Sequence, residues 1–200
     1  YIHEKIYDKV LDGAVEKLSK LKMGNALDEK SDIGAIISEE QLKRTLYYMD
    51  IAKKNSSTKI LHGGNQSKGG DYKDGFYYEP TLLSGLPVSS PVCQEEVFGP
   101  VACAIPFKSF DEVMKSANDT QFGLSAVLWT KDLSRALQFV DEIEAGFVQV
   151  NQCVAPRANV SYGGIKMSGL GKEYAFDSMM NHFTQSKTVL INRGKSNLDV

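Results

Sequence analysis

Two adjacent carboxylates beside an aromatic residue form the most chemically informative segment of the chain, Gln94-Glu95-Glu96-Val97-Phe98-Gly99-Pro100. The Gly-Pro step disfavours both helix and strand, so the segment is predicted to be a rigid loop that holds polar groups in place. In an extended loop Glu95 and Glu96 point in opposite directions, which excludes an acid-base pair at one site and directs at least one carboxylate outward. Phe98, held against the Gly-Pro turn, offers a platform for a planar ligand, and two ordinary surface charges are the alternative interpretation.

A glycine-rich segment from Tyr162 to Glu173 invites comparison with phosphate-binding loops. It matches neither G-x-x-x-x-G-K-[ST] nor G-x-G-x-x-G, and no buried strand is predicted directly before it. Its glycines instead indicate a chain that turns sharply beside other backbone.

The three cysteines are odd in number and widely spaced, which argues against a disulfide framework and fits a reducing compartment such as the cytoplasm. Cys103 lies in an apolar run and is interpreted as a small buried hydrophobe. Cys93 and Cys153 lie in predicted loops with no histidine nearby in sequence, so no catalytic residue is assigned. The Cys and His spacing predicts no metal site. Arg157 is a cation where a substrate could approach, with a solvated surface arginine as the alternative.

The composition is that of a globular protein with a genuine core: 200 residues, 42% hydrophobic and 24% charged. A net charge of -2 gives no reason to expect nucleic acid or an anionic membrane as a partner. The apolar runs fall far short of the ~20 residues that cross a bilayer. The polar N-terminus does not resemble a signal peptide, and a chain that starts at Tyr1 could be a piece of a longer one.

Helical and extended patterns alternate along the chain and would position these residues. Helices are expected over Glu4–Leu21, from Ser38 to Asn55 behind a capping box, from Ser109 to Asn118 behind another, over Asp132–Ile143 with Gly146 as a left-handed stop, and over Tyr174–Asn181. Strands are expected over Lys59–Leu61, Phe76–Leu83 with Pro80 marking an edge, Val101–Ile105 as the first well-buried strand, Ser125–Thr130, Phe147–Asn151 and Thr188–Asn192. The order from Val101 onward predicts an α/β fold with a mainly parallel sheet flanked by helices.

Taken in order, several segments resemble the C-terminal part of the catalytic domain of aldehyde dehydrogenases, beginning just after the nucleophilic cysteine. They are Ile6-Tyr7-Asp8, Ser38-x-x-Gln41-x-x-Arg44, Glu79-Pro80-Thr81, Glu95-Glu96-Val97-Phe98-Gly99-Pro100-Val101, Gly123-Leu124-Ser125-Ala126, Gly146 to Asn151, Tyr162-Gly163-Gly164-Ile165-Lys166-x-Ser168-Gly169-x-Gly171-Lys172-Glu173 and Lys187-Thr188-Val189. Each is weak alone, but their order makes the family assignment strong.

The resemblance implies NAD or NADP as cofactor and assigns cofactor-binding roles to four residues. Glu96 would accept both hydroxyl protons of the nicotinamide ribose, and Phe98 would pack beside the nicotinamide. Gln41 and Arg44, one turn apart on a helix, would reach the ribose on the adenosine side.

The resemblance also places residues 152–162 along the aldehyde tunnel, with Val154, Pro156, Arg157 and Tyr162 as substrate-binding residues. It divides the chain into a partial catalytic domain (1–186), a strand that adds to a neighbouring subunit's sheet (187–192) and a tail (193–200). The expected partners are a small-molecule aldehyde, the remainder of an aldehyde dehydrogenase chain and further copies in a dimer or tetramer.

The family's chemistry uses a cysteine thiolate that attacks the aldehyde and a glutamate that activates water, and neither aligns with a residue of this chain. The chain is therefore expected to be part of an enzyme that oxidises aldehydes to carboxylic acids, and to be inactive alone. The alternative is a truncated, non-catalytic paralogue that serves as an oligomerisation or regulatory module.

Overall fold

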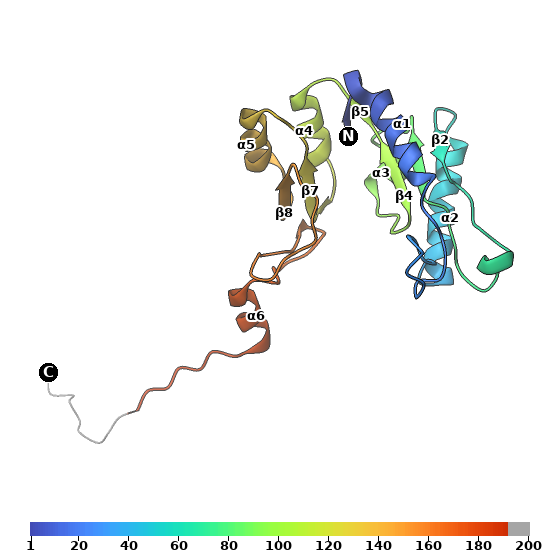
Figure 1. Ribbon diagram of the computed structural model, residues 1–200. Coiled ribbons are helices and arrows are strands. Elements are labelled where there is room, and N and C mark those ends of the chain that lie inside the picture. Colours follow the sequence, from blue (N-terminus) through green and yellow to red (C-terminus); the bar gives the residue numbers. More distant parts are fainter. Residues whose placement is uncertain (192–200) are drawn as a thin grey trace, which may run out of the picture. The chain divides into compact units, whose positions relative to one another are not determined.

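The computed structural model describes residues 1–191 and divides into two compact units, one spanning Tyr1–Thr120 and the other beginning at Gln121 (Figure 1). The first unit contains β1 (Ile2–His3), a 3-10 turn (Glu4–Ile6), α1 (Tyr7–Leu18), α2 (Glu39–Lys54), β2 (Lys59–His62), a second 3-10 turn (Gly70–Tyr72), β3 (Thr81–Ser84), α3 (Pro91–Gln94), β4 (Val101–Ala104), β5 (Pro106–Phe107) and α4 (Phe110–Asn118). The second contains β6 (Phe122–Gly123), β7 (Ser125–Leu128), α5 (Leu133–Glu142), β8 (Phe147–Val150), β9 (Ile165–Lys166) and α6 (Phe176–Phe183).

The core of the first unit is a three-stranded sheet in the order β2-β3-β4, with β3 antiparallel to β2 and parallel to β4. Successive residues of a strand face opposite sides of a sheet. Leu83 packs into the cluster that contains Met49 of α2, whereas Leu82 packs with Leu11 of α1. Helices α2 and α1 therefore cover opposite faces, which leaves all four residues of β3 buried.

Two strand predictions in this unit are wrong. Pro80 does not mark an edge, because β3 is the central strand and begins one residue later. The buried strand is β3 rather than β4, in which Ala104 alone is fully buried. The apolar run that begins at Val101 is less buried than its composition predicts because β4 lies at the edge of the three-stranded sheet, with β3 beside it on one side.

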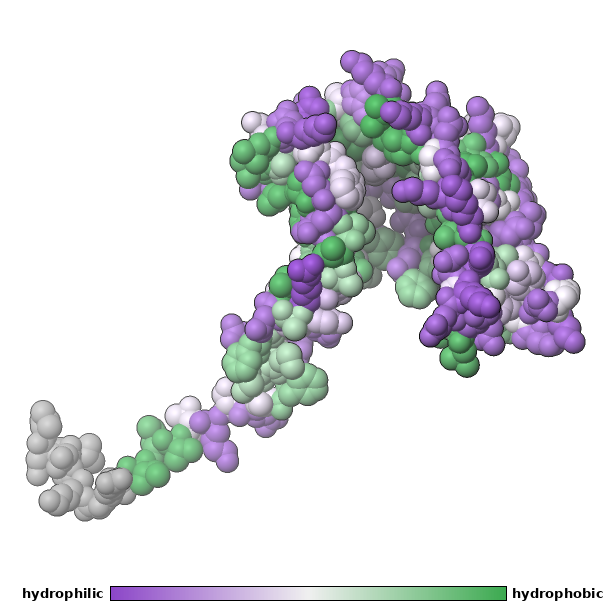
Figure 2. All heavy atoms as spheres, viewed as in Figure 1, coloured by the Kyte–Doolittle hydropathy of each residue, from purple (hydrophilic) through white to green (hydrophobic). Residues whose placement is uncertain are grey.

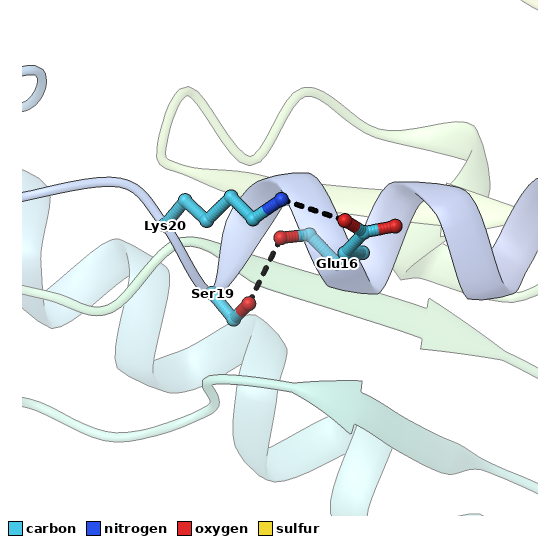
Figure 3. Close-up of polar contacts among 3 residues, drawn as sticks. All are labelled: Glu16, Ser19 and Lys20. Atoms are coloured by element: carbon cyan, nitrogen blue, oxygen red, sulfur yellow. Dashed lines mark hydrogen bonds and ion pairs between the residues drawn. The ribbon is translucent and has the colours of Figure 1, made fainter.

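The helix-end signals are largely confirmed. Ser109 and Glu112 form the complete capping box at the start of α4. Ser38 caps α2 by accepting a hydrogen bond from the Gln41 amide, but the Gln41 side chain does not return the bond. At the C-terminus of α1 the Ser19 hydroxyl donates to the Glu16 carbonyl, and the Lys20 ammonium pairs with the Glu16 carboxylate (Figure 3).

The second unit is built on a β7-α5-β8 crossover with parallel strands, as the sequence predicts. Gly146 is not a left-handed stop, because α5 already ends at Glu142 and the next residue, Ile143, is extended. Gly146 is needed for a different reason: a Cβ there would collide with the Gly163 carbonyl.

Glycines in the Tyr162–Glu173 segment allow a close backbone approach, as predicted. A Cβ on Gly164 would lie 2.7 Å from the Ser168 carbonyl oxygen. The Lys172 ammonium fills the adjoining space and donates to the Gly163 carbonyl at 2.6 Å. An antiparallel bridge between Tyr162 and Glu173 closes the segment, and its strand β9 pairs with β6.

Residues 184–191 contain no helix or strand in this chain. Val189, Leu190 and Ile191 are 63%, 93% and 79% exposed, and Figure 2 colours the stretch of chain just before its grey residues as hydrophobic. Asn192 and the predicted tail lie outside the described residues. An intermolecular strand has no partner in a single chain, so the oligomerisation strand stays a prediction.

Candidate functional site

Side chains on one face of α2 donate hydrogen bonds to main-chain carbonyls of the loop between α3 and β4. The Gln41 side-chain amide donates to two consecutive carbonyls, of Val97 at 2.9 Å and of Phe98 at 2.8 Å. The Arg44 guanidinium donates twice to the Glu96 carbonyl, from Nε at 3.1 Å and from Nη2 at 2.6 Å. Because these bonds go to carbonyls, they fix the path of the loop without occupying its side chains.

Tyr48 continues the same face and secures the start of the loop. Positions 41, 44 and 48 have the i, i+3, i+7 spacing that aligns side chains along a helix. The Tyr48 hydroxyl donates to the Glu95 carboxylate at 2.7 Å, and the Arg44 guanidinium lies over the Tyr48 ring, 5.8 Å from its centroid. The hydrogen bond to Glu95 is the main reason that the pKa of Tyr48 is raised, with burial adding to it. We call residues 95–99 the clamped loop.

The clamped loop ends where Gly99 packs directly on α2. A Cβ on Gly99 would lie 2.5 Å from the Thr45 hydroxyl and 3.3 Å from its methyl group. Thr45 is fully buried and its hydroxyl donates to the Gln41 carbonyl, so a change of its rotamer would break this hydrogen bond. The Gly-Pro step therefore serves close packing as well as the turn.

The hydrogen bonds from α2 leave the side chains of Glu96 and Phe98 unbound. Both glutamates are exposed, and Glu95 accepts the hydrogen bond from Tyr48, while the opposite directions expected for the two side chains stay a prediction. Among residues 1–191 no hydrogen bond or ion pair engages the Glu96 carboxylate. The Phe98 ring is 69% exposed, and its backbone has a φ of 53°, which is unusual for a bulky residue. The Glu96 carboxylate and the Phe98 ring are both available, with only Val97 between them in sequence. A carboxylate can bind hydroxyl groups and an aromatic ring can pack on a planar group, so the pair is suited to a hydroxylated, planar ligand.

The structure gives Gln41 and Arg44 a role that the sequence did not indicate. Their donors are engaged by loop carbonyls, so they act here as positioning residues, and direct contact of either with a cofactor stays a prediction. Sequence reasoning missed Tyr48 and Thr45. The helical spacing of Tyr48 with Gln41 and Arg44 was the available signal.

The predicted substrate residues lie on the irregular segment after β8. Gln149, buried on β8, accepts a hydrogen bond from the Val154 amide at 2.9 Å through its side-chain oxygen. Asn151 has a φ of 54° and bonds both the amide and the carbonyl of Thr130, at 2.9 and 2.8 Å. These two side chains set the direction in which the segment leaves the strand.

Within that segment the predicted residues differ in exposure. Val154 and Arg157 are exposed, whereas Pro156 and Tyr162 are half-buried. The Tyr162 ring meets Phe147 and Tyr174 edge-on, with centroids 5.2 and 5.9 Å away, and its main chain bridges to Glu173. Tyr162 thus anchors the segment by packing, while Val154 and Arg157 present their side chains outward.

The described residues contain neither a metal-binding cluster nor a membrane-spanning helix. Over residues 1–191 no cluster of three or more His, Cys, Asp or Glu side chains could hold a metal ion. Nor does any helix in that range have the length and apolar character needed to span a bilayer.

The strands, mainly parallel, and the helices that pack on them define an α/β protein, with the candidate ligand-binding groups on loops that follow these elements. Residues 1–189 match the aldehyde dehydrogenase family model. An aldehyde dehydrogenase of Rhodospirillum rubrum is 38% identical over 95% of this chain and 37% of its own length. Betaine aldehyde dehydrogenase of Brucella melitensis is 33% identical over 98% of this chain and 40% of its own length.

The solved structures agree. Betaine aldehyde dehydrogenase from Staphylococcus aureus, determined in complex with NAD+, is 32% identical and superposes with a TM-score of 0.84 over 90% of this chain and 35% of its own. The chain described here belongs to the aldehyde dehydrogenase family. It spans a little over a third of the length of the curated relatives it matches.

Proposed function

We propose that this chain is the cofactor-positioning and substrate-lining portion of an NAD(P)-dependent aldehyde dehydrogenase that oxidises an aldehyde to a carboxylic acid. The observation that carries the proposal is the clamped loop, which is held by its carbonyls and leaves the side chains of Glu96 and Phe98 exposed. The solved relative in complex with NAD+ supports the choice of cofactor.

In this proposal Glu96 accepts the two ribose hydroxyl protons, and Phe98 supports one face of the nicotinamide ring. The cofactor supplies the hydride acceptor. The contribution of this chain is orientation, because the helix-held carbonyls of residues 96–98 fix the backbone from which both side chains project. Such positioning raises the rate of transfer by restricting the ring to productive geometries.

Val154, Pro156, Arg157 and Tyr162 line the path of the aldehyde. The apolar and cationic side chains of this segment accept an aromatic or a carboxylate-bearing substrate equally well, so the proposal names the aldehyde class only. Because none of its three cysteines is assigned the nucleophile's role, the isolated chain is expected to form no NADH or NADPH from aldehydes.

The segment from Lys187 to Asn192 adds as a strand to the sheet of a neighbouring subunit. The exposed side chains of Val189, Leu190 and Ile191 support this, since apolar residues in a strand-compatible segment favour burial against a partner. A chain ending at Ser186 is then expected to give a smaller species in light scattering than the chain with residues 187–192.

The two adjacent glutamates allow a matched test in the natural protein that contains this chain. Glu96→Gln is expected to lower kcat more than it weakens cofactor binding, because the ribose contact orients the ring. Glu95→Gln is the control: it weakens the bond to Tyr48 and lowers stability, with a smaller effect on kcat. Unchanged turnover in Glu96→Gln would remove that residue from the site.

A further inference from the structure

Two cysteines that are ten residues apart in sequence meet beneath the clamped loop. Cys93 lies in α3, before the loop, and Cys103 lies on β4, after it. Both are free and half-buried, and both pack against the same hydrophobic cluster. Both also line one cavity of about 300 Å³ together with Glu95, Val97 and Phe98.

The two thiols interact directly. An interaction between the two sulfurs lowers the pKa of Cys93, and the same interaction together with burial raises the pKa of Cys103. The Cys103 thiol donates a weak hydrogen bond to the Val92 carbonyl oxygen at 3.9 Å, at the residue before Cys93. The thiolate is the reactive form of a cysteine, so Cys93 is the nucleophile of the pair and Cys103 the resolving thiol.

We propose that Cys93 and Cys103 form a reversible oxidation site for peroxides, which ends in a disulfide that spans the clamped loop. The Cys93 sulfur attacks the O–O bond of hydrogen peroxide, forming an S–O bond, and water leaves as the peroxide is reduced. The Cys103 sulfur then displaces the oxygen of this sulfenic acid, forming the S–S bond and a second water. A dithiol reductant restores both thiols.

This site is independent of the proposed dehydrogenase function, because the reaction consumes peroxide and needs neither cofactor nor aldehyde. The disulfide would nevertheless constrain the clamped loop. Cys93 lies two residues before Glu95, and the bond would close a covalent ring around residues 94–102.

The positions of the cleavage sites make the product easy to read. Trypsin and a glutamate-specific protease together release Cys93 in a peptide of residues 74–95, Cys103 in one of residues 97–108 and Cys153 in one of residues 145–157. After treatment of the full chain with hydrogen peroxide, mass spectrometry of the alkylated digest is expected to find the first two peptides joined. Dithiothreitol is expected to separate them.

Two variants assign the order of the steps. In Cys103→Ser the Cys93 sulfenic acid cannot be resolved, so dimedone is expected to label residue 93 several-fold more than in the unchanged chain. In Cys93→Ser, Cys103 is expected to stay open to alkylation after the same treatment. The proposal is overturned if the 74–95 and 97–108 peptides stay unlinked while peroxide is consumed, or if either joins the Cys153 peptide instead.

Discussion

Arg44→Met removes both hydrogen bonds to the Glu96 carbonyl and tests whether α2 holds the loop in place. Hydrogen bonds from a charged donor contribute roughly 1.5–3 kcal/mol. Arg44 and Glu96 are exposed, so water takes over part of the lost interaction. We therefore expect the loop to open about 1 kcal/mol more easily, which corresponds to a roughly fivefold increase in its open population.

Amide hydrogen exchange followed by mass spectrometry measures that population directly. Peptides covering residues 94–100 are expected to exchange about five times faster in Arg44→Met, with little change elsewhere in α2. Lys43→Met is the matched control, because Lys43 lies on the same helix and pairs with Glu39 at 2.9 Å on the exposed side. If loop exchange in Arg44→Met is no faster than in Lys43→Met, the positioning role assigned to Arg44 is wrong.

Three further changes in the first unit test a buried hydroxyl, the packing of a glycine and a helix cap. Tyr78→Phe removes a buried hydroxyl that has no partner among the described residues, so the free energy of unfolding in urea is expected to rise by about 1 kcal/mol. Burial raises the pKa of Tyr78 from 10.0 to about 12 in the folded chain, so the free energy of unfolding falls as pH rises through that window, and Tyr78→Phe should lose less stability there than the unchanged chain. Gly99→Ala is expected to cost about 1–3 kcal/mol because its Cβ would press on Thr45, and a neutral result in thermal unfolding would show that α2 yields freely. Ser109→Ala should cost about 1 kcal/mol through loss of the capping box at α4, as measured by urea unfolding.

The sequence predicted the helices and the loop because their signals are local. Capping residues at Ser38 and Ser109, together with helical periodicity, identify where helices begin. The expectation that at least one of the two glutamate carboxylates is exposed is confirmed, since both Glu95 and Glu96 are exposed. These features depend only on neighbours along the chain.

What the sequence did not predict depends on partners that are distant along the chain. Gln41 reads as half of a capping box, but its side chain is drawn to carbonyls 56 and 57 residues away. Pro80 reads as an edge signal, yet the strand that follows it is central because α1 and α2 cover both faces of the sheet. Gly146 reads as a helix stop, whereas the backbone at Gly163 is what excludes a side chain there. Only tertiary contacts decide such cases.

The central claim is that this chain positions the cofactor in an aldehyde-oxidising enzyme. The most direct test is to assay the natural protein that contains the chain for NADH or NADPH formation with a panel of aliphatic, aromatic and carboxylate-bearing aldehydes. The account predicts turnover of at least one of them, with a marked loss of kcat in Glu96→Gln. A folded protein that binds NAD(P) but oxidises none of these aldehydes would contradict it.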